Sequence, residues 1–482
     1  MRWRFTLQVV GIVVCFVGMA MLVPLGASLY FQGSMINPFL ESISLTLSCG
    51  LVLFFLFRST EVETITHREG MAIVTLGWAS AGFFGSLPFL LSGYVPVFTD
   101  CVFETFSGFT TTGATIFDNV EILPKSLLLW RSLTQWLGGM GIILLSLAIL
   151  PFLGVGGMQL YKAEVPGPTP DKLRPRVKDT ALLLWKVYLL FTALEIILLF
   201  LGGMDFFSSV CHTFDTMPTG GFSTKNASIG HYSSLYFDIV ITVFMFIAGT
   251  NFAIHFKLLR GDLRSFWRDP EFRFYLGAIV VFTLVICITL WGSVYVSLGQ
   301  SLRFSLFQVV SIVTTTGYAT ADYELWGALP QVLLFLCMFL GGCAGSTGGG
   351  IKGMRILVLI KHVKSEMVRA IHPNAIIPVK FGGRVVPAEV LNGIWGFFLL
   401  YCGLTCIATI VLAAVKVDIL TSFAAVIACM SNVGPGLGLV GPTDNYAHIP
   451  KLGKWVLSFC MLLGRLEIYT VIVLFTPVFW KK

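Results

Sequence analysis

Four short polar strings interrupt an otherwise apolar chain at nearly equal intervals. They read "TTTGAT" (110–115), "PTGGFS" (218–223), "TTTGYAT" (314–320) and "SNVGPGLG" (431–438). The first glycines of these strings are 107, 97 and 117 residues apart, at Gly113, Gly220, Gly317 and Gly434. Such a regular internal period predicts one structural unit used four times.

Composition identifies the solvent in which these units fold. Hydrophobic residues make up 56% of the 482 residues, charged residues only 12%, and mean hydropathy is +0.85. A soluble protein of this size carries about a quarter charged residues. The chain is therefore expected to be an all-α polytopic membrane protein, because each span must satisfy its own backbone hydrogen bonds in lipid. The net charge of +7 does not point to nucleic acid here, since the basic residues gather in a few connecting segments, a pattern that indicates membrane topology.

Apolar stretches of about 20 residues mark the membrane spans. Ten are predicted, at 5–30, 36–58, 70–93, 124–154, 180–203, 230–258, 273–297, 328–361, 391–415 and 452–479. Four further stretches are too short to span, at 99–110, 205–217, 301–313 and 418–431, and each leads into one of the polar strings. Stretches of that length are typical of re-entrant half-helices.

The predicted order is a two-helix preface followed by four membrane–pore-loop–membrane repeats around one central pore. Repeats one and three align without gaps, Phe103, Ser107 and Gly113 matching Phe307, Ser311 and Gly317. The predicted domains are the preface 1–68 and repeats 69–178, 179–270, 271–384 (with a gating loop at 341–355) and 385–482.

Charge predicts the orientation in the membrane. Ten spans place both termini on one side, where most of the 32 Lys and Arg residues gather, in segments such as 172–178, 257–273 and 361–384. The positive-inside rule makes that side cytoplasmic. All four strings then open outward.

The strings have the chemistry of a cation filter. Non-helical backbone at membrane depth is tolerated where it lines water or is buried in protein, and carbonyl oxygens can there replace the water shell of an ion. The strings contain no carboxylate, which favours a weakly hydrated monovalent ion. The half-helices would aim their partly negative C-terminal ends at the cavity. The alternative is four ordinary helix-breaking turns.

Five motifs resemble the TrkH/TrkG membrane subunits of bacterial Trk potassium uptake systems, in the superfamily that includes KtrB and the plant HKT transporters. They are "FETFSGFTTTGAT", "FDTMPTGGFST", "SIVTTTGYAT", "SNVGPGLG" and "GGCAGSTGGGIKGMR", and the resemblance covers essentially the whole chain. It implies that the four repeats form one pore in one chain, with the first glycines as filter glycines. A serine at the first of these accompanies sodium preference in the superfamily, so Gly113 favours potassium.

The predicted site follows from the strings and the resemblance. The expected potassium-binding filter residues are Thr111, Thr112, Gly113, Thr219, Gly220, Thr315, Thr316, Gly317, Asn432, Val433 and Gly434. Potassium is the substrate, and no cofactor is expected. The resemblance also implies a homodimer in the bacterial inner membrane and a cytoplasmic ring of TrkA-like nucleotide-binding subunits that opens the gate. The basic loops 257–273 and 361–384 are its expected docking sites.

The string "GGCAGSTGGGIKGMR" (341–355) interrupts a predicted span with seven glycines in fifteen residues. A continuous helix would be unfavourable there, at about 1 kcal/mol for each glycine relative to alanine. An unwound loop below the third filter string could obstruct the pore, and the resemblance likewise implies an intramembrane gate. The expected gate residues are Gly345, Ser346, Thr347, Gly348, Gly349, Gly350 and Arg465. A nucleotide-binding P-loop is excluded because Ile351 stands where lysine is needed, and tight helix packing is the remaining alternative.

Arg465 lies in the last predicted span, where a charged side chain indicates function. We expect it to bind carbonyls of the gate loop and to repel cations. The alternative is a structural arginine paired with a carboxylate of a neighbouring helix.

Two transport mechanisms stay open at this stage. A potassium channel fits parallel repeats whose strings all face outward, whereas a secondary carrier that couples potassium to protons or sodium is the second candidate. An enzyme is not expected, because no catalytic cluster of histidines and carboxylates occurs inside the spans.

Overall fold

The computed structural model describes residues 1–58, 66–148, 173–262 and 264–481. Almost every regular element in them is a helix, which confirms the predicted all-α class. The exception is a short antiparallel hairpin of β1 (Lys380–Phe381) and β2 (Arg384–Val385), which turns at two glycines with positive φ.

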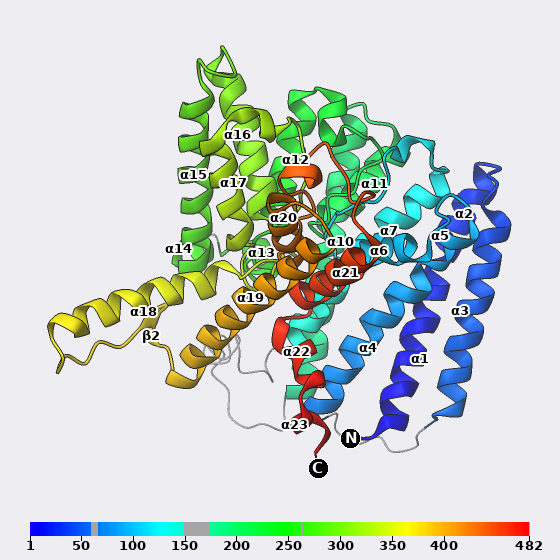
Figure 1. Ribbon diagram of the computed structural model, residues 1–482, viewed down its shortest axis with the longest axis horizontal. Coiled ribbons are helices and arrows are strands. Elements are labelled where there is room, and N and C mark those ends of the chain that lie inside the picture. Colours follow the sequence, from blue (N-terminus) through cyan, green and yellow to red (C-terminus); the bar gives the residue numbers. More distant parts are fainter. Residues whose placement is uncertain (59–65, 149–172, 263, 482) are drawn as a thin grey trace.

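The helices follow one another in the predicted order (Figure 1). The first third of the chain forms α1 (Trp3–Ala20), α2 (Leu22–Tyr30), α3 (Ile36–Leu56), α4 (His67–Gly85), α5 (Leu87–Leu91), α6 (Phe98–Phe109) and α7 (Lys125–Ala148). The middle forms α10 (Leu173–Leu201), α11 (Phe206–Thr216), α12 (Leu235–Ala248), α13 (Phe252–Leu259), α14 (Arg264–Arg268), α15 (Pro270–Leu290), α16 (Leu298–Val313), α17 (Ala328–Leu340) and α18 (Gly353–Ile371). The last part forms α19 (Ala388–Ala414), α20 (Ile419–Met430), α21 (Lys451–Arg465), α22 (Ile468–Ile472) and α23 (Pro477–Trp480).

Six helical segments of the described chain are long and apolar enough to cross a membrane by themselves. They are 3–30, 36–56, 67–91, 180–201, 270–290 and 388–414, and all six coincide with predicted spans. The predicted span 124–154 corresponds to α7, and its last residues lie outside the described ones. The predicted span 328–361 contains only the 13 residues of α17 before the helix stops.

Two predicted spans are wrong in one respect, because the structure breaks them. Helices α12 and α13 meet at 104°, and α21 meets α22 at 117°. The second break occurs at Glu467, whose φ of 65° no α-helix can contain. It also makes Arg465 the last residue of α21 rather than the middle of a continuous helix. Both breaks lie where residues 341–352 pack against the two helices, so tertiary contacts determine them.

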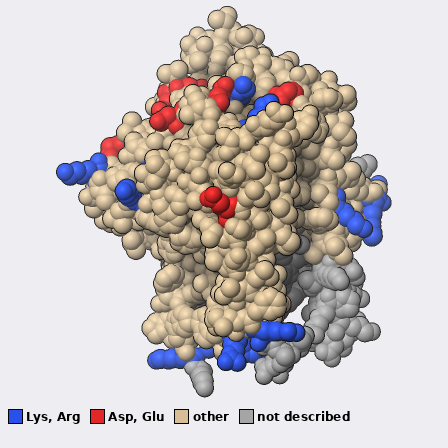
Figure 2. Space-filling view, turned by 90° about the vertical axis from the view of Figure 1, so that its right-hand side faces the viewer, with Lys and Arg blue, Asp and Glu red and all other residues tan. Residues whose placement is uncertain are grey.

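The two ends of the molecule differ in charge. Both termini lie at the lower end in Figure 1, where Figure 2 shows Lys and Arg but no Asp or Glu, while further Lys and Arg lie at mid-height and near the top. Most Asp and Glu on the same face lie in its upper half, with a wide uncharged surface below them. Helix α18 projects from the body at the basic end (Figure 1). An apolar belt between charged ends is the surface that a bilayer solvates.

Candidate functional site

The four short helices α6, α11, α16 and α20 all end in the same hydrogen-bonded turn. In each, one backbone N–H reaches back five residues at 2.8 Å: Thr112 to Ser107, Gly220 to Asp215, Thr316 to Ser311 and Val433 to Ala428. The N–H of the residue before it reaches back three residues, at 2.9 to 3.2 Å. These two bonds make a Schellman motif, which requires a left-handed residue.

That left-handed position is held by residues that seldom adopt it. Thr111, Thr219, Thr315 and Asn432 have φ values of 51°, 58°, 61° and 55°. Asparagine tolerates this conformation, but a β-branched threonine there is strained. Such strain costs about 1–3 kcal/mol per residue and persists only where the surroundings impose it. The four equivalent turns therefore mark a conformation that the fold imposes on its sequence.

The structure corrects the alignment of the second string by one residue. By hydrogen bonding, Gly220 matches Thr112, whereas Gly221 matches Gly113. The φ angles agree with this register. Gly221 has a φ of 76°, close to the 81°, 78° and 94° of Gly113, Gly317 and Gly434. The predicted equivalence of Gly220 with Gly113 is therefore wrong. "PTGGFS" offers two adjacent glycines, and only the hydrogen-bond register distinguishes them.

The four strings form a closed ring. Each string glycine packs so tightly against a carbonyl oxygen of the next string that a Cβ atom would collide with it. The pairs are Gly113 with Gly220, Gly221 with Thr316, Gly317 with Val433 and Gly434 with Thr112. The contacts run through the strings in chain order and return to the first. Because all four carbonyls precede a string glycine directly, the ring has approximate fourfold symmetry.

The hydroxyl of the third threonine in two strings bonds to the end of its own short helix. The hydroxyls of Thr112 and Thr316 each lie 2.8 Å from the hydroxyl of the threonine two residues earlier. Thr112 also accepts a 3.0 Å bond from the Asn432 amide. These hydroxyls hold the strings in place. The backbone carbonyls of these residues, rather than their hydroxyls, are therefore the oxygen atoms suited to a central ligand.

A cavity of about 120 Å³ opens on one side of the ring. All four ring glycines line it, together with the residues that follow them in each string. Gly221 belongs to this lining and Gly220 does not, in agreement with the corrected register. Two acidic residues, Asp118 and Asp444, and two basic residues, Arg131 and Lys225, also line the cavity.

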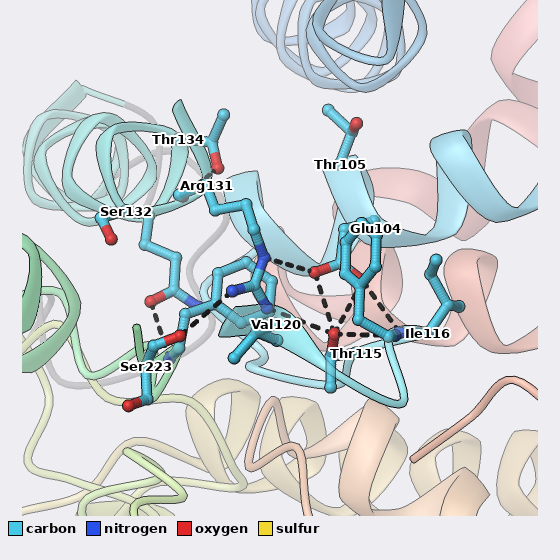
Figure 3. Close-up of polar contacts among 12 residues, drawn as sticks. Glu104, Thr105, Thr115, Ile116, Val120, Arg131, Ser132, Thr134 and Ser223 are labelled. Atoms are coloured by element: carbon cyan, nitrogen blue, oxygen red, sulfur yellow. Dashed lines mark hydrogen bonds and ion pairs between the residues drawn. The ribbon is translucent and has the colours of Figure 1, made fainter. Parts of the chain in front are cut away.

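A buried ion pair supports the first string (Figure 3). Arg131 of α7 donates from Nε to Glu104 of α6 at 2.8 Å, and both side chains are almost fully buried. Glu104 also accepts the N–H of Ile116, and Arg131 also donates to the Ser223 carbonyl, which joins strings one and two. The site predicted from the sequence included neither Glu104 nor Arg131. A charge inside an apolar helix was the available signal.

Residues 341–352 are the part of the expected gating loop (341–355) that precedes α18, and are called the gate loop below. They lie against string residues that precede the ring carbonyls. The N–H of Gly349 donates to the Thr315 hydroxyl at 2.7 Å, and the Thr347 hydroxyl donates to the Met217 carbonyl at 3.0 Å. A Cβ atom on Gly349 would come within 3.0 Å of Asn432. The loop thus contacts residues that come just after α11, α16 and α20, where these helices end at the ring.

Arg465 binds the middle of the gate loop. Its Nη1 donates to the Thr347 carbonyl at 2.6 Å, and its Nη2 lies 3.5 Å from the Gly138 carbonyl. The side chain is 3% exposed. No carboxylate among the described residues pairs with it, and the nearby Glu467 pairs with Arg355 at 2.6 Å. The contact expected from the sequence is present, and the alternative of a carboxylate partner is not seen in this part of the chain. Its gating role stays a prediction.

Comparison with known proteins assigns the family. A family model described as TrkH, cation transport protein, matches residues 36–482. The chain belongs to the TrkH family. Its ring and cavity are thus features of a TrkH-family transport protein, and the chain is not an enzyme.

The similarity extends over whole chains. The Trk system potassium uptake protein TrkH of Escherichia coli K12 is 43% identical over 488 residues and covers 100% of both chains. TrkG of the same organism is 35% identical over 482 residues, covering 99% of each. The crystal structure of the potassium transporter TrkH from Vibrio parahaemolyticus matches with a TM-score of 0.91 at 37% identity, covering 100% of both chains.

Proposed function

We propose that this protein conducts potassium ions into a bacterial cell across the inner membrane, through the ring formed by its four strings. The observation that carries the proposal is the closed ring, in which equivalent carbonyls of Thr112, Gly220, Thr316 and Val433 each face the glycine of a neighbouring string. Carbonyl rings replace the hydration shell of a monovalent cation. The printed names of the similar proteins, potassium uptake protein and potassium transporter, support potassium as the ion.

The filter set is the predicted one with Gly221 added. The ring supports a role for Thr112, Gly220, Thr316 and Val433 through their carbonyls, and for the glycine after each as the neighbour that permits close approach. Gly113, in place of a serine, supports selection of potassium over sodium.

The gate loop closes the pore from the cytoplasmic side in this proposal. It contacts the ends of α11, α16 and α20, and Arg465 adds a buried positive charge beside it. A cation that leaves the ring inward would meet both the loop and this charge. Release of Thr347 from Arg465 would remove the barrier.

The assembly and orientation belong to the same proposal. Both termini face the cytoplasm, the four repeats have the predicted boundaries, and the protein works as a homodimer with a cytoplasmic TrkA-like ring. The basic end that carries both termini supports this orientation (Figure 2).

A flux assay tests the proposal. Purified wild-type protein and a variant lacking residues 348–350, expected to be open, are reconstituted into liposomes, and the currents of potassium, rubidium and sodium are measured. We expect the open variant to pass potassium and rubidium in preference to sodium, with a reversal potential at the potassium equilibrium value. A reversal potential that moves with a proton or sodium gradient would indicate a coupled carrier instead. No potassium-selective flux from either protein would overturn the proposal.

A further inference from the structure

One carboxylate bonds to both ends of the gate loop. Oε1 of Glu271 accepts the N–H of Ala344 at 2.9 Å and the N–H of Met354 at 2.8 Å. Ala344 lies early in the loop, and Met354 lies in the first turn of α18, just after the loop ends. Glu271 is 5% exposed, so water competes little for these bonds.

The end of the loop at α18 has no cap of its own. The first N–H groups of a helix lack partners within the helix and need a cap. Lys352, which precedes α18, makes no side-chain cap and holds a strained φ of 77°. Glu271 caps this helix from α15, and a carboxylate is favoured at a helix N-terminus.

The two ends of the loop also touch each other. A Cβ atom on Gly350 would lie 2.7 Å from Cα of Gly341, and both glycines have positive φ. Glu271 therefore lies at the neck of a closed loop, whereas Arg465 binds its middle. The gate loop is therefore held at two separate places, by Glu271 at its ends and by Arg465 at its middle.

Glu271 is itself fixed from the cytoplasmic side. It is the second residue of α15, and the Asp269 carboxylate before it accepts the N–H groups of Glu271 and Phe272 at 2.8 and 2.9 Å. The ring of Phe266, in α14, packs edge-on against Phe272 at 4.9 Å. A displacement of α14 would therefore act directly on the turn that carries Glu271.

We propose that Glu271 is a positioning residue that clamps both ends of the gate loop, so that release of this carboxylate favours opening of the loop, independently of Arg465. This inference rests on the proposed potassium conduction. It adds a control point outside the ring and away from Arg465.

The test compares Glu271→Gln and Glu271→Ala with the wild type in potassium-loaded liposomes. Loss of two hydrogen bonds to a charged acceptor should raise flux about tenfold or more in the alanine variant. The glutamine variant keeps an acceptor oxygen without the charge and should lie between. The ratio of potassium to sodium permeability should stay at the wild-type value, because the ring is untouched. If Glu271 only stabilised the fold, its substitution would lower flux or selectivity instead.

The matched control is Glu389→Gln, which neutralises an exposed carboxylate in the first turn of another helix, α19. Its flux should equal that of the wild type. Arg465→Ala is the positive control for an open gate. If Arg465→Ala raises flux and neither Glu271 variant does, the clamp is wrong. If no variant conducts potassium, the proposed function itself has failed.

Discussion

Gly221 lies against the carbonyl oxygen of Thr316 so closely that no side chain fits between the second and third strings. The same relation recurs between each string and the next. This contact makes Gly221, rather than its neighbour in the sequence, the residue on which the second quarter of the ring depends.

Gly221→Ala is expected to lower the preference for potassium over sodium, because the added methyl group must displace the Thr316 carbonyl. The reversal potential under opposing potassium and sodium gradients measures this preference. Gly203→Ala is the control, since Gly203 also has positive φ, 98°, but nothing lies within 4 Å of the added atom. An unchanged reversal potential in Gly221→Ala would exclude the corrected register.

Gly113→Ser should also reduce potassium selectivity, by pressing a side chain against the Gly220 carbonyl. We expect sodium permeability to rise relative to potassium while rubidium still follows potassium. The same reversal-potential measurement applies. If the serine variant keeps the wild-type selectivity for potassium over sodium, Gly113 is not a filter residue.

Arg465→Ala should raise flux in protein reconstituted without any partner. The substitution removes a buried charge-assisted hydrogen bond to Thr347, and such bonds contribute about 1.5–3 kcal/mol, so we expect an increase of about tenfold or more. Arg303→Ala serves as the control, because Arg303 pairs with Asp238, which has no contact with the gate loop. Equal or lower flux in Arg465→Ala would contradict the role of this residue as a latch.

Arg131→Met should destabilise the fold, since it leaves Glu104 as an unpaired buried charge. Breaking a buried ion pair on one side costs about 3–5 kcal/mol, whereas replacing both partners costs less. The double variant Glu104→Gln with Arg131→Met should therefore unfold at a higher temperature than Arg131→Met alone. Thermal unfolding of the purified protein in detergent compares the two. If Arg131→Met unfolds at the same temperature as the wild type, the ion pair contributes little to the stability of the fold.

Charge reversal of Arg264 and Arg268 should weaken copurification with a TrkA-like ring. Both side chains are exposed on α14, which packs against the start of α15. Lys416→Glu, placed between α19 and α20, is the control for a change in net charge. If the ring copurifies equally well with the doubly reversed protein, α14 is not its docking site.

Much of this architecture could be predicted from the sequence. Apolar lengths located the spans and the half-helices, because a bilayer demands about 20 apolar residues for each crossing. Repeated spacing identified four strings, and the cost of burying charge singled out Arg465. These features depend on local composition and on distance along the chain, both of which a sequence displays directly.

Only the tertiary structure decided how the strings and the gate meet. The choice between Gly220 and Gly221 depends on which carbonyl each faces across the ring. Glu271 and the two loop residues that it binds are 70 or more positions apart in the sequence, and so are Arg465 and Thr347. The helix breaks at 249–251 and at Glu467 likewise lie where distant segments pack together. A hydrogen bond or a steric contact between such residues leaves no periodicity in either segment. The sequence therefore determined which parts exist, and packing determined which atoms of those parts touch.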